Sequence, residues 1–533
     1  MRMRRAHLIT LAAALTLAAC ADEPPTGPPP TSQSRANASD PTPNAISLRK
    51  IGSFDGGAPG AAEITAFDRV SRRLFVVNGA LGTVDVLDLR NPAAPAREAT
   101  ISVAGFGASA NSVAAHNGVV AIAVEGHVKT DPGSVVFYRA TTLQLISQVT
   151  VGALPDMLTF SPSGRLVVVA NEGEPNDAYT IDPEGSISII DVTDINAPIV
   201  RTAGFGAFNG QADALRARGV RIFGPGATVA QDLEPEYVAI SEDESTAYVA
   251  LQENNALAIV DLAAAAVTSV APLGYKNHAL AGNGLDASDR DGAVNIRTWP
   301  VFGMYQPDAI AAYTVGGQTY LVTANEGDAR DYDGFAEEER VNGLTLDPGI
   351  FSDAACGGPC SANERLGRLT VTTTLGRNPA TGQFDALFAF GARSFSIWTQ
   401  DGRQVWDSGE DFERRTAFIP QANFNASHDN NDFDNRSDNK GPEPEGVVLG
   451  QLGAKTFAFI GLERIGGVMV YDVSNPNSPQ FVHYANTRLG TAGDLGPEGL
   501  AFIPARESPS RRPLLVVGHE ISGTTTVFEI DLN

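Results

Sequence analysis

The stretch LPDMLTFSPSGRLVVVANEGE, residues 154–174, shows the pattern that repeats along this chain. The acid Asp156 opens a short apolar strand, a turn containing proline and glycine follows, and a second apolar strand ends at Glu172. Two strands joined by a tight turn place the start of the first beside the end of the second. The stretch therefore predicts a β-hairpin that carries two carboxylates on one rim.

This arrangement occurs six times, with the second position about 15 to 22 residues after the first. The opening acids are Glu63, Asp156, Glu236, Asp308, Glu445 and Glu498. The returning ends are Glu172, Glu253, Glu326, Glu463 and Glu520, with Asn78 standing in for an acid in the first copy. A repeated antiparallel unit predicts an all-β fold, a single β-propeller. Two stacked β-sandwiches are the alternative, which fits an even repeat less well.

We expect seven or eight blades, because the segment between Ala324 and Trp398 is irregular and two of the hairpins could share one blade. The last copy lacks an outer strand, whereas Ile46 to Phe54 is an apolar strand just before the first copy. We expect these two to pair, so that the amino-terminal strand closes the ring and removes its open edges.

The long segments between strands are expected to crowd the acidic face of the propeller. In a propeller unit, the segment leading into the first strand and the loop between the second and third strands share that face. The long segments fall at these places: Gly173 to Gly185, Gly204 to Leu233, Pro272 to Gln306, Gly327 to Arg365 and Glu410 to Glu443.

Crowded carboxylates favour calcium as the cofactor, because calcium prefers hard oxygen ligands. Solvated rim charge is the alternative, yet like charges that converge repel each other without a cation. The candidate metal ligands are Asp156, Glu172, Glu236, Glu253, Asp308, Glu326, Glu445, Glu463, Glu498 and Glu520. Four other acids end third strands and are interpreted as structural acceptors of turn amides: Asp88, Asp191, Asp261 and Asp472.

Two loops supply further metal candidates. Asp286, Asp289 and Asp291 have a spacing that partly resembles calcium-binding turns, without the glutamate expected at the twelfth position of a helix-loop-helix site. Asp432 and Asp434 belong to an acidic loop that runs directly into the opening acid Glu445. A disordered acidic loop is the alternative for this second segment.

The amino terminus has the charge order of a secretory signal. Three arginines precede an apolar run over residues 8–17, which is too short to span a bilayer as a stable helix. Residues 17–20, Leu-Ala-Ala-Cys, then resemble a bacterial lipobox. The resemblance implies cleavage before Cys20 and a lipid on this cysteine, so that the membrane is a partner. A chance apolar leader that ends in cysteine is the alternative.

The chain thus divides into three expected parts. Residues 1–19 are a lipoprotein signal peptide, residues 20–44 are the lipidated cysteine and a disordered Pro-rich tether, and residues 45–533 are the propeller. The expected location is the bacterial cell envelope, facing the periplasm or the exterior. In an exported protein, Cys356 and Cys360 most simply form a small-loop disulfide.

The formal net charge of −24 argues against a nucleic-acid partner, because phosphate backbones bind basic surfaces. Familiar catalytic patterns are also absent: we find no His-Glu-x-x-His, no Gly-x-Ser-x-Gly elbow and no phosphate-binding glycine loop ending in lysine. Catalytic residues therefore stay unassigned.

Several segments resemble the choice-of-anchor I family, whose relatives include animal mesenchyme-specific cell-surface glycoproteins associated with mineral deposition. The resembling segments are residues 154–174, 232–236, 323–332, 391–397 and 440–447. The resemblance implies a secreted or surface-held propeller and carries no agreed reaction. The family name reflects varied carboxy-terminal anchors, whereas here the lipobox predicts an amino-terminal one.

A more distant similarity is to phytase-like and esterase-like propellers, in which calcium on one face holds anionic substrates. It makes Arg330 and Arg393 candidate anion-binding residues, with structural ion pairing as the alternative. Three functions follow. The leading hypothesis is a calcium-binding propeller that engages an anionic small molecule, a mineral or a cell-surface partner. The others are a calcium-dependent phosphoric ester hydrolase and a metal-free envelope scaffold.

Overall fold

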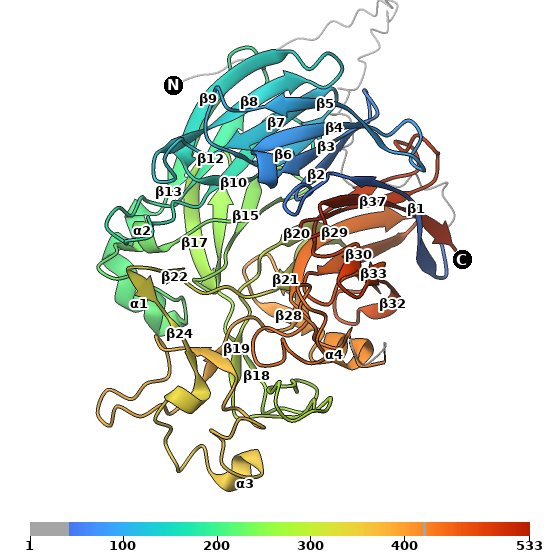
Figure 1. Ribbon diagram of the computed structural model, residues 1–533. Coiled ribbons are helices and arrows are strands. Elements are labelled where there is room, and N and C mark those ends of the chain that lie inside the picture. The colour runs from blue at the N-terminus through green and yellow to red at the C-terminus, as the bar shows by residue number, and fades with distance from the viewer. Residues whose placement is uncertain (1–41, 419–422) are drawn as a thin grey trace, which may run out of the picture.

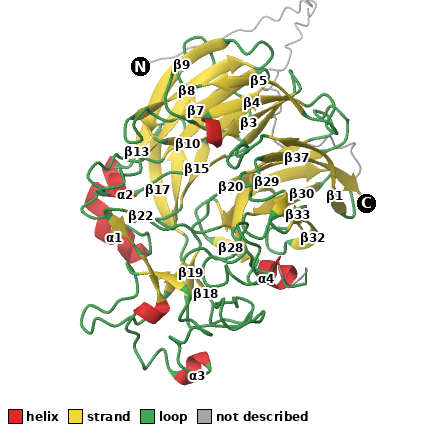
Figure 2. Cartoon of the chain, viewed as in Figure 1, coloured by secondary structure: helices red, strands yellow, loops and turns green. Residues whose placement is uncertain are grey.

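The structure, a computed structural model, describes residues 42–418 and 423–533. The expected signal peptide, Cys20 and nearly all of the tether lie outside the described residues. Strands dominate the described chain, and short helices lie at its periphery (Figure 2). No helix among these residues is both long and apolar enough to cross a membrane.

Seven four-stranded antiparallel sheets form most of the described chain. The first contains β2 (Thr65–Asp68), β3 (Arg73–Asn78), β4 (Thr83–Asp88) and β5 (Ala96–Ser102). The second contains β6 (Ala110–His116), β7 (Val119–Val124), β8 (Pro132–Arg139) and β9 (Leu145–Ala153). The third contains β10 (Pro155–Phe160), β11 (Leu166–Asn171), β12 (Ser186–Asp191) and β13 (Ile199–Gly204). The fourth contains β14 (Val238–Ile240), β15 (Thr246–Leu251), β16 (Ala256–Asp261) and β17 (Ala266–Pro272).

The remaining three sheets are formed in the same way, with one exception in strand order. The fifth contains β20 (Ile310–Val315), β21 (Gln318–Asn325), β27 (Ser394–Thr399) and β28 (Gln404–Asp407). The sixth contains β29 (Pro444–Leu452), β30 (Lys455–Leu462), β31 (Val468–Asp472) and β32 (Gln480–Ala485). The seventh contains β35 (Pro497–Ile503), β36 (Leu514–His519), β37 (Thr524–Leu532) and, at its outer edge, β1 (Ile46–Asp55).

The pairing of β1 with β37 confirms the expected partner of the amino-terminal strand. The two strands are antiparallel, with Ile46 opposite Leu532 and Asp55 opposite Thr524. They lie side by side in Figure 1 although they come from opposite ends of the described chain. The seventh sheet thus takes its outer strand from the start of the sequence.

Long insertions interrupt the sheets. Two of them together form a five-stranded sheet. The segment before β20 supplies β18 (Tyr275–Asn277) and β19 (Phe302–Met304), and the segment between β21 and β27 supplies β26 (Phe388–Ala389), β25 (Thr370–Thr372) and β24 (Glu338–Arg340). Two-stranded sheets pair β22 (Asp331–Tyr332) with β23 (Phe335–Ala336) and β33 (Arg488–Leu489) with β34 (Ala492–Gly493). The helices are α1 (Ala212–Arg218), α2 (Val229–Asp232), α3 (Asp353–Cys356) and α4 (Asp411–Thr416), with 3-10 turns η1 (Gly79–Leu81), η2 (Gly206–Gln211) and η3 (Val341–Gly343).

The irregular segment between Ala324 and Trp398 is therefore explained by an insertion. It leaves the fifth sheet after β21 and returns to it at β27, so the two hairpins that the sequence left open share one sheet. A disulfide joins Cys356 and Cys360 within this insertion. Figure 1 shows the five-stranded sheet and α3 projecting away from the four-stranded sheets.

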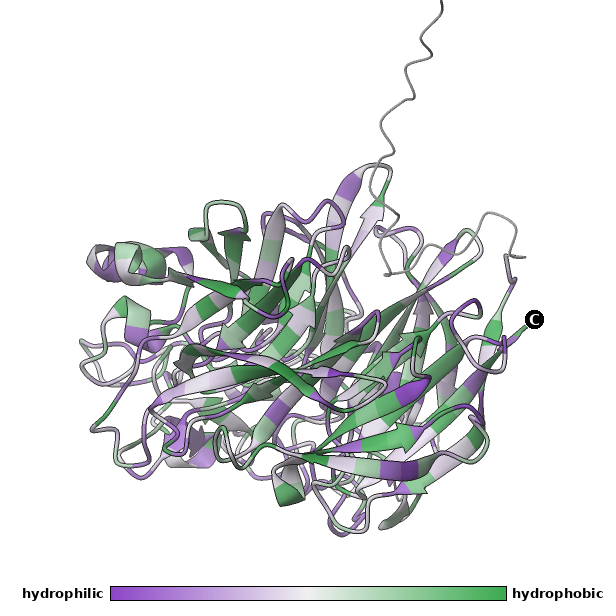
Figure 3. Ribbon diagram, turned by 90° about the horizontal axis from the view of Figure 1, so that it is seen from above, coloured by the Kyte–Doolittle hydropathy of each residue, from purple (hydrophilic) through white to green (hydrophobic). Residues whose placement is uncertain are grey.

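The core lies between neighbouring sheets. In β11, Val167 and Val169 pack toward the second sheet, whereas Val168 and Ala170 pack toward the fourth. Similar buried clusters join each sheet to the next, and a last one joins the seventh sheet to the first. Both faces of each sheet are thus covered, and apolar residues follow many of the strands (Figure 3). This is a propeller-like arrangement.

Candidate metal-binding site

Acids from six of the seven sheets gather at one end of the first strands. Asp156, Glu236, Asp308, Glu445 and Glu498 lie at or just before the starts of β10, β14, β20, β29 and β35, and Glu63 precedes β2. Glu172, Glu253, Glu326, Glu463 and Glu520 follow the second strands of the third to seventh sheets. In the second sheet Asn111 takes the opening position. The structure thus brings the ten predicted ligands to the same end of the sheets.

Glu326, Glu445 and Glu463 form a compact group. Each offers one carboxylate oxygen, and these atoms all lie within 4.8 Å of one another. Glu326 belongs to the fifth sheet and the other two to the sixth, so the group bridges two sheets. Oε2 of Glu445 is buried and has no hydrogen-bond partner among the described residues. An all-oxygen donor set with an unpartnered carboxylate oxygen fits a hard cation such as calcium.

Glu236 and Glu253 of the fourth sheet are within electrostatic reach of Glu172, which follows β11 of the third sheet. Glu236 and Glu253 are 7% and 4% exposed, and Oε2 of each is buried without a partner among the described residues. Burial, followed by the charges of Glu253 and Glu172, raises the pKa of Glu236 well above its ordinary value. The carboxylates therefore oppose each other's ionisation in the absence of a cation.

The acids also face one another across the centre of the molecule. Burial, then Glu326 and Asp156, raise the pKa of Asp308 well above its ordinary value. Burial, then Glu520, Glu63 and Asp308, do the same for Glu498. Asp156, Asp308 and Glu498 belong to the third, fifth and seventh sheets, so carboxylates from non-adjacent sheets lie within electrostatic reach of each other.

These shifts predict how stability depends on pH in the calcium-free chain. Burial is the main factor that raises the pKa of Glu63, Asp156 and Glu253 to about 7 and that of Glu463 to about 8. The folded chain then binds more protons than the unfolded chain between about pH 4.5 and pH 8, so stability falls as pH rises through this window. Each pKa unit on one group corresponds to about 1.4 kcal/mol, and we expect a loss on the order of a few kcal/mol.

The measurement is urea unfolding of the chelated chain at pH 5.5, 6.5 and 7.5. The unfolding midpoint should fall at each step, and saturating calcium should flatten the dependence, because a bound cation favours the ionised carboxylates. A midpoint that rises with pH in the chelated chain would contradict the raised pKa values of these carboxylates.

Two cationic side chains enter the acidic region from one side. Lys440 Nζ lies 2.5 Å from Glu326 Oε1, and Arg464 lies 3.2 Å from Glu463 Oε1 and 3.0 Å from Glu443 Oε2. Burial alone would raise the pKa of Glu443, yet neighbouring cations, Lys440 and Arg464 among them, hold it at about 2. These cations therefore keep Glu443 ionised although it is buried.

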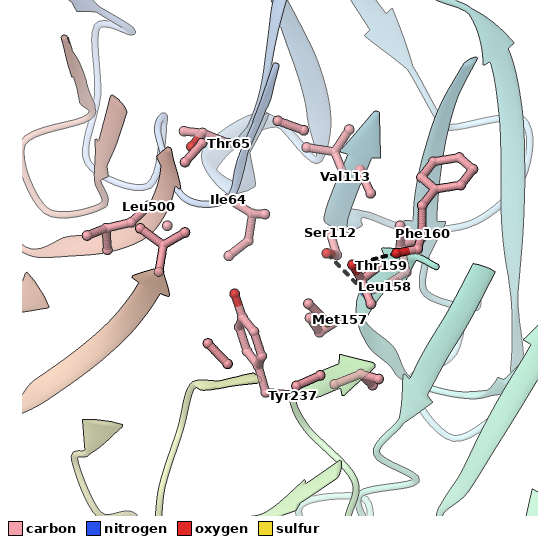
Figure 4. A pocket seen from close by; sticks show the side chains of 18 of the residues that line it. Ile64, Thr65, Ser112, Val113, Met157, Leu158, Thr159, Phe160, Tyr237 and Leu500 are labelled. Atoms are coloured by element: carbon pink, nitrogen blue, oxygen red, sulfur yellow. Dashed lines mark hydrogen bonds between the residues drawn. The ribbon is translucent and has the colours of Figure 1, made fainter. Parts of the chain in front are cut away.

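The first strands of all seven sheets line a central cavity of about 320 Å³. Its lining combines apolar side chains, Ile64, Met157 and Leu500 among them, with polar groups such as Thr65 and Ser112 (Figure 4). The hydroxyl of Tyr237 points into this space. Burial and the charges of Asp308, Asp156 and Glu498 raise the pKa of Tyr237, so this side chain is within electrostatic reach of the central acids. The sequence reasoning missed Tyr237, although it directly follows the opening acid Glu236.

The long insertions contact one another at the acidic end of the sheets, where we expect the long segments to lie. Arg330, after β21, pairs with Asp232 and lies 2.9 Å from Glu234 Oε2. Arg393, before β27, lies 2.7 Å from Glu413 Oε1 and donates to the carbonyls of Asp286, Ser437 and Asn439. Both guanidinium groups are almost fully buried and engaged by protein acceptors. This matches the structural alternative for Arg330 and Arg393 rather than anion binding.

The loop acids separate into two kinds. Asp286, Asp291 and Asp434 come together, each with one carboxylate oxygen within 4.8 Å of the others. Asp289 instead pairs with Arg368 and Arg290, and Asp432 is exposed. The structure thus does not bring Asp289 or Asp432 into the group.

Asn78 does not stand in for a returning acid, contrary to the sequence interpretation. It faces Thr83 in the register in which Asn171 faces Ser186, so its counterparts are asparagines. Its Nδ2 donates to Asp85 and its Oδ1 accepts from the Leu81 amide. Gly79 holds the returning position, and a Cβ there would meet the Glu63 carboxylate at 2.0 Å.

The acids that end third strands have the structural role inferred for them. Asp88 accepts from the Arg90 amide, Asp191 from the Thr193 amide, Asp261 from the Ala264 amide, and Asp472 from the Ser474 amide. Each bond stays within the turn that follows the strand, which separates these acids from the central ones.

The fold and the site define a propeller-like all-β protein with an acidic central end. The chain belongs to the choice-of-anchor I family, because the sequence profile of the choice-of-anchor I domain matches residues 63–476.

Two relatives share part of the sequence. Gigasin-3a of Magallana gigas is 30% identical over 184 residues, which are 31% of this chain and 64% of that protein. The mesenchyme-specific cell surface glycoprotein of Strongylocentrotus purpuratus is 28% identical over 325 residues, which are 52% of this chain and 41% of that protein. The chain thus spans less than two thirds of either relative.

Two solved structures that superpose on this chain are distant from it in sequence. Hydrazine synthase of Kuenenia stuttgartiensis is 14% identical with a TM-score of 0.48, covering 90% of this chain and 98% of that one. The β-propeller domain of Myceliophteria thermophila Cps50 (Swd1) is 9% identical with a TM-score of 0.42, covering 91% and 99%.

Proposed function

We propose that this protein is a surface-held β-propeller that binds calcium through its central carboxylates and engages an anionic or surface-associated ligand there. The observation that carries the proposal is the group of Glu326, Glu445 and Glu463, whose ligand oxygens lie within 4.8 Å of one another. Calcium bound to such a group keeps free coordination positions for oxygens of an anionic partner, because calcium takes six to eight oxygen ligands.

Further support comes from oxygens that lack a donor. Among the described residues, one oxygen each of Glu236, Glu253 and Glu445 is buried without a hydrogen bond. Burial and like charge raise the pKa of these acids, and Asp156, Asp308 and Glu498 have no cation among the groups that shift their pKa. A divalent cation would supply positive charge to the central acids that no lysine or arginine of the described residues pairs with, such as Glu445.

The blade assignment is part of the same proposal. We take the seven four-stranded sheets as seven blades, with β1 completing the seventh and so closing the ring. The central cavity, lined by the first strand of every sheet, supports this assignment. Closure holds opening and returning acids of neighbouring blades at fixed separations, as a preorganised cation site requires.

A surface or extracellular location is in keeping with the family and with a relative named as a cell surface glycoprotein. Lipid attachment at Cys20 would hold this chain in the bacterial envelope with the propeller facing the periplasm or the exterior. Incorporation of labelled palmitate into the wild-type chain, and its loss in Cys20→Ala, tests the anchor independently of calcium.

The function is tested by counting calcium ions per chain after equilibrium dialysis. Glu445→Gln should bind at least one ion fewer than the wild type, because it removes a ligand charge and keeps the side chain's shape. Asp213→Asn is the matched control, since Asp213 is exposed and far from the sheets' first strands in α1. Equal calcium counts in the wild type and in Glu445→Gln would contradict the proposal.

The other functions are distinguished by turnover of a panel of phosphate esters with and without calcium. Calcium-dependent release of phosphate that Glu236→Gln plus Glu445→Gln abolishes would identify the ester hydrolase. Calcium binding without turnover supports the binding function. A chain that binds no calcium under any condition would leave the metal-free scaffold.

A further inference from the structure

A second group of carboxylates lies outside the central site, where two insertions meet. Asp286 and Asp291 belong to the segment between β18 and β19, and Asp434 belongs to the segment between α4 and β29. One carboxylate oxygen of each lies within 4.8 Å of the others, although the two segments are far apart in the sequence. The three acids therefore converge only through the packing of the two insertions.

Oxygens in this group lack hydrogen-bond donors. Asp434 is 2% exposed; its Oδ1 accepts from Ser437 Oγ at 2.5 Å, while its Oδ2 is buried with no partner among the described residues. Asn425 is fully buried and donates through Nδ2 to Ser437 Oγ at 2.8 Å and Glu413 Oε1 at 2.7 Å. Its Oδ1 is buried and also unpartnered. Two buried acceptors connected through Ser437 thus lack a donor, which native proteins seldom tolerate.

Protein cations do not compensate the three acids. Among the described residues, no lysine, arginine or histidine forms an ion pair with Asp286, Asp291 or Asp434. The nearby Arg393 donates instead to Glu413 and to backbone carbonyls, that of Asp286 among them. Burial, followed by the charges on Asp286 and Asp291, raises the pKa of Asp434 to about 8.

The donors that Asp286 and Asp291 do have are arranged around the group. Asp286 Oδ2 accepts from the Asn295 amide at 2.5 Å, and Asp291 Oδ2 accepts from Asn295 Nδ2 at 2.8 Å. These bonds fix the two carboxylates relative to each other and leave lone pairs for another partner, since each carboxylate has about four acceptor positions.

We propose that Asp286, Asp291 and Asp434 hold a calcium-type divalent cation that joins the two insertions and is separate from the central site. All the candidate ligand atoms are carboxylate oxygens from irregular loop segments rather than from paired strands. Calcium accepts such variable oxygen geometry more readily than the smaller magnesium. Asn425 Oδ1 is a further candidate ligand, because it is buried without a donor and Asn425 is linked to Asp434 through the Ser437 hydroxyl.

The cation has a structural consequence for the central site. The segment that carries Asp434 continues through Lys440, Glu443 and Glu445, which belong to the central acidic region. A cation that fixes Asp434 against Asp286 therefore positions this segment as it approaches β29. Loss of the cation should loosen the insertions while leaving the seven sheets folded.

The test counts calcium ions bound to the full chain after chelation and equilibrium dialysis. Asp434→Asn should bind one ion fewer than the wild type. Asp432→Asn is the matched control, because Asp432 is exposed, lies two residues away and stays outside the group. Glu445→Gln should lose a central ion and keep this one, so that failure of the central site and failure of this site give different counts. A full count in Asp434→Asn would overturn the proposal.

A second variant and a second readout guard against misfolding of Asp434→Asn. Asp291→Asn changes a less buried member and should weaken one class of calcium sites at least tenfold in a calcium titration. Limited proteolysis should show that calcium protects the segment 423–443 in the wild type and in Asp432→Asn, and not in Asp291→Asn. Equal calcium affinity and equal protection in all three chains would also overturn the proposal.

Discussion

Replacement of Arg330 by methionine should lower the free energy of unfolding by about 3–5 kcal/mol, the usual cost of removing one partner of a buried ion pair. The Arg330 side chain is fully buried, pairs with Asp232 and Glu234, and lies 4.4 Å from the centre of the Phe223 ring. Methionine fills much of the same volume but leaves two carboxylates buried without their cation. Urea unfolding of the calcium-loaded chain measures the effect.

Two controls assign this loss to the ion pair. Arg216→Met removes an arginine whose partner Asp213 is exposed, and we expect a change within about 1 kcal/mol. Adding Asp232→Asn and Glu234→Gln to Arg330→Met should recover part of the loss, because the stranded charges are then neutral. If Arg330→Met kept full stability and lost binding of inorganic phosphate, Arg330 would be an anion-binding residue instead.

Calcium should stabilise the chelated chain by several kcal/mol, the second large effect that the structure predicts. A ligand that binds only the folded state contributes about 2.7 kcal/mol per site at a free concentration one hundred times its Kd. The proposed central site is the group around Glu445, where a bound cation would also relieve the repulsion between the acids. Melting curves across a calcium titration, with magnesium at equal concentrations, measure the gain.

The double variant Glu236→Gln plus Glu445→Gln makes this prediction specific. Without calcium it should melt above the chelated wild type, because glutamine at these buried positions requires neither a buried charge nor the uptake of a proton on folding. With calcium it should melt below the wild type, because the lost ligands weaken binding. Curves that keep the same order with and without calcium would contradict a central calcium site.

The sequence predicted the hairpins and their acids because both depend on local patterns. A strand pair such as β10 and β11 is encoded by an apolar run, a turn with Gly164 and a second run, and the alternation fixes which face each valine covers. Asp156 and Glu172 then lie at one rim through hairpin geometry alone. The pairing of β1 with β37 could also be inferred, because the last repeat lacked an outer strand and the strand Ile46 to Phe54 belonged to no repeat.

Contacts between insertions could not be predicted in this way. The meeting of Asp286 with Asp434 depends on how two irregular segments pack, and no periodicity records it. Asp289 and Asp432 have the same local character as these acids and yet point elsewhere. Asn78 was misassigned because its register, rather than its distance from Glu63, decides its role. Tyr237 was missed because its importance comes from acids on three other sheets, not from its neighbours in sequence.

The position of β1 in the seventh sheet also affects how this protein is made. Among the described strands, β1 is synthesised before and β37 after the strands of the other six sheets, so the sheet that contains both cannot form until those strands have been made. Contacts between residues so distant in sequence slow folding. The ten-residue β1 should therefore remain without its partner strand through most of synthesis, and the seventh sheet should be the last of the seven to form.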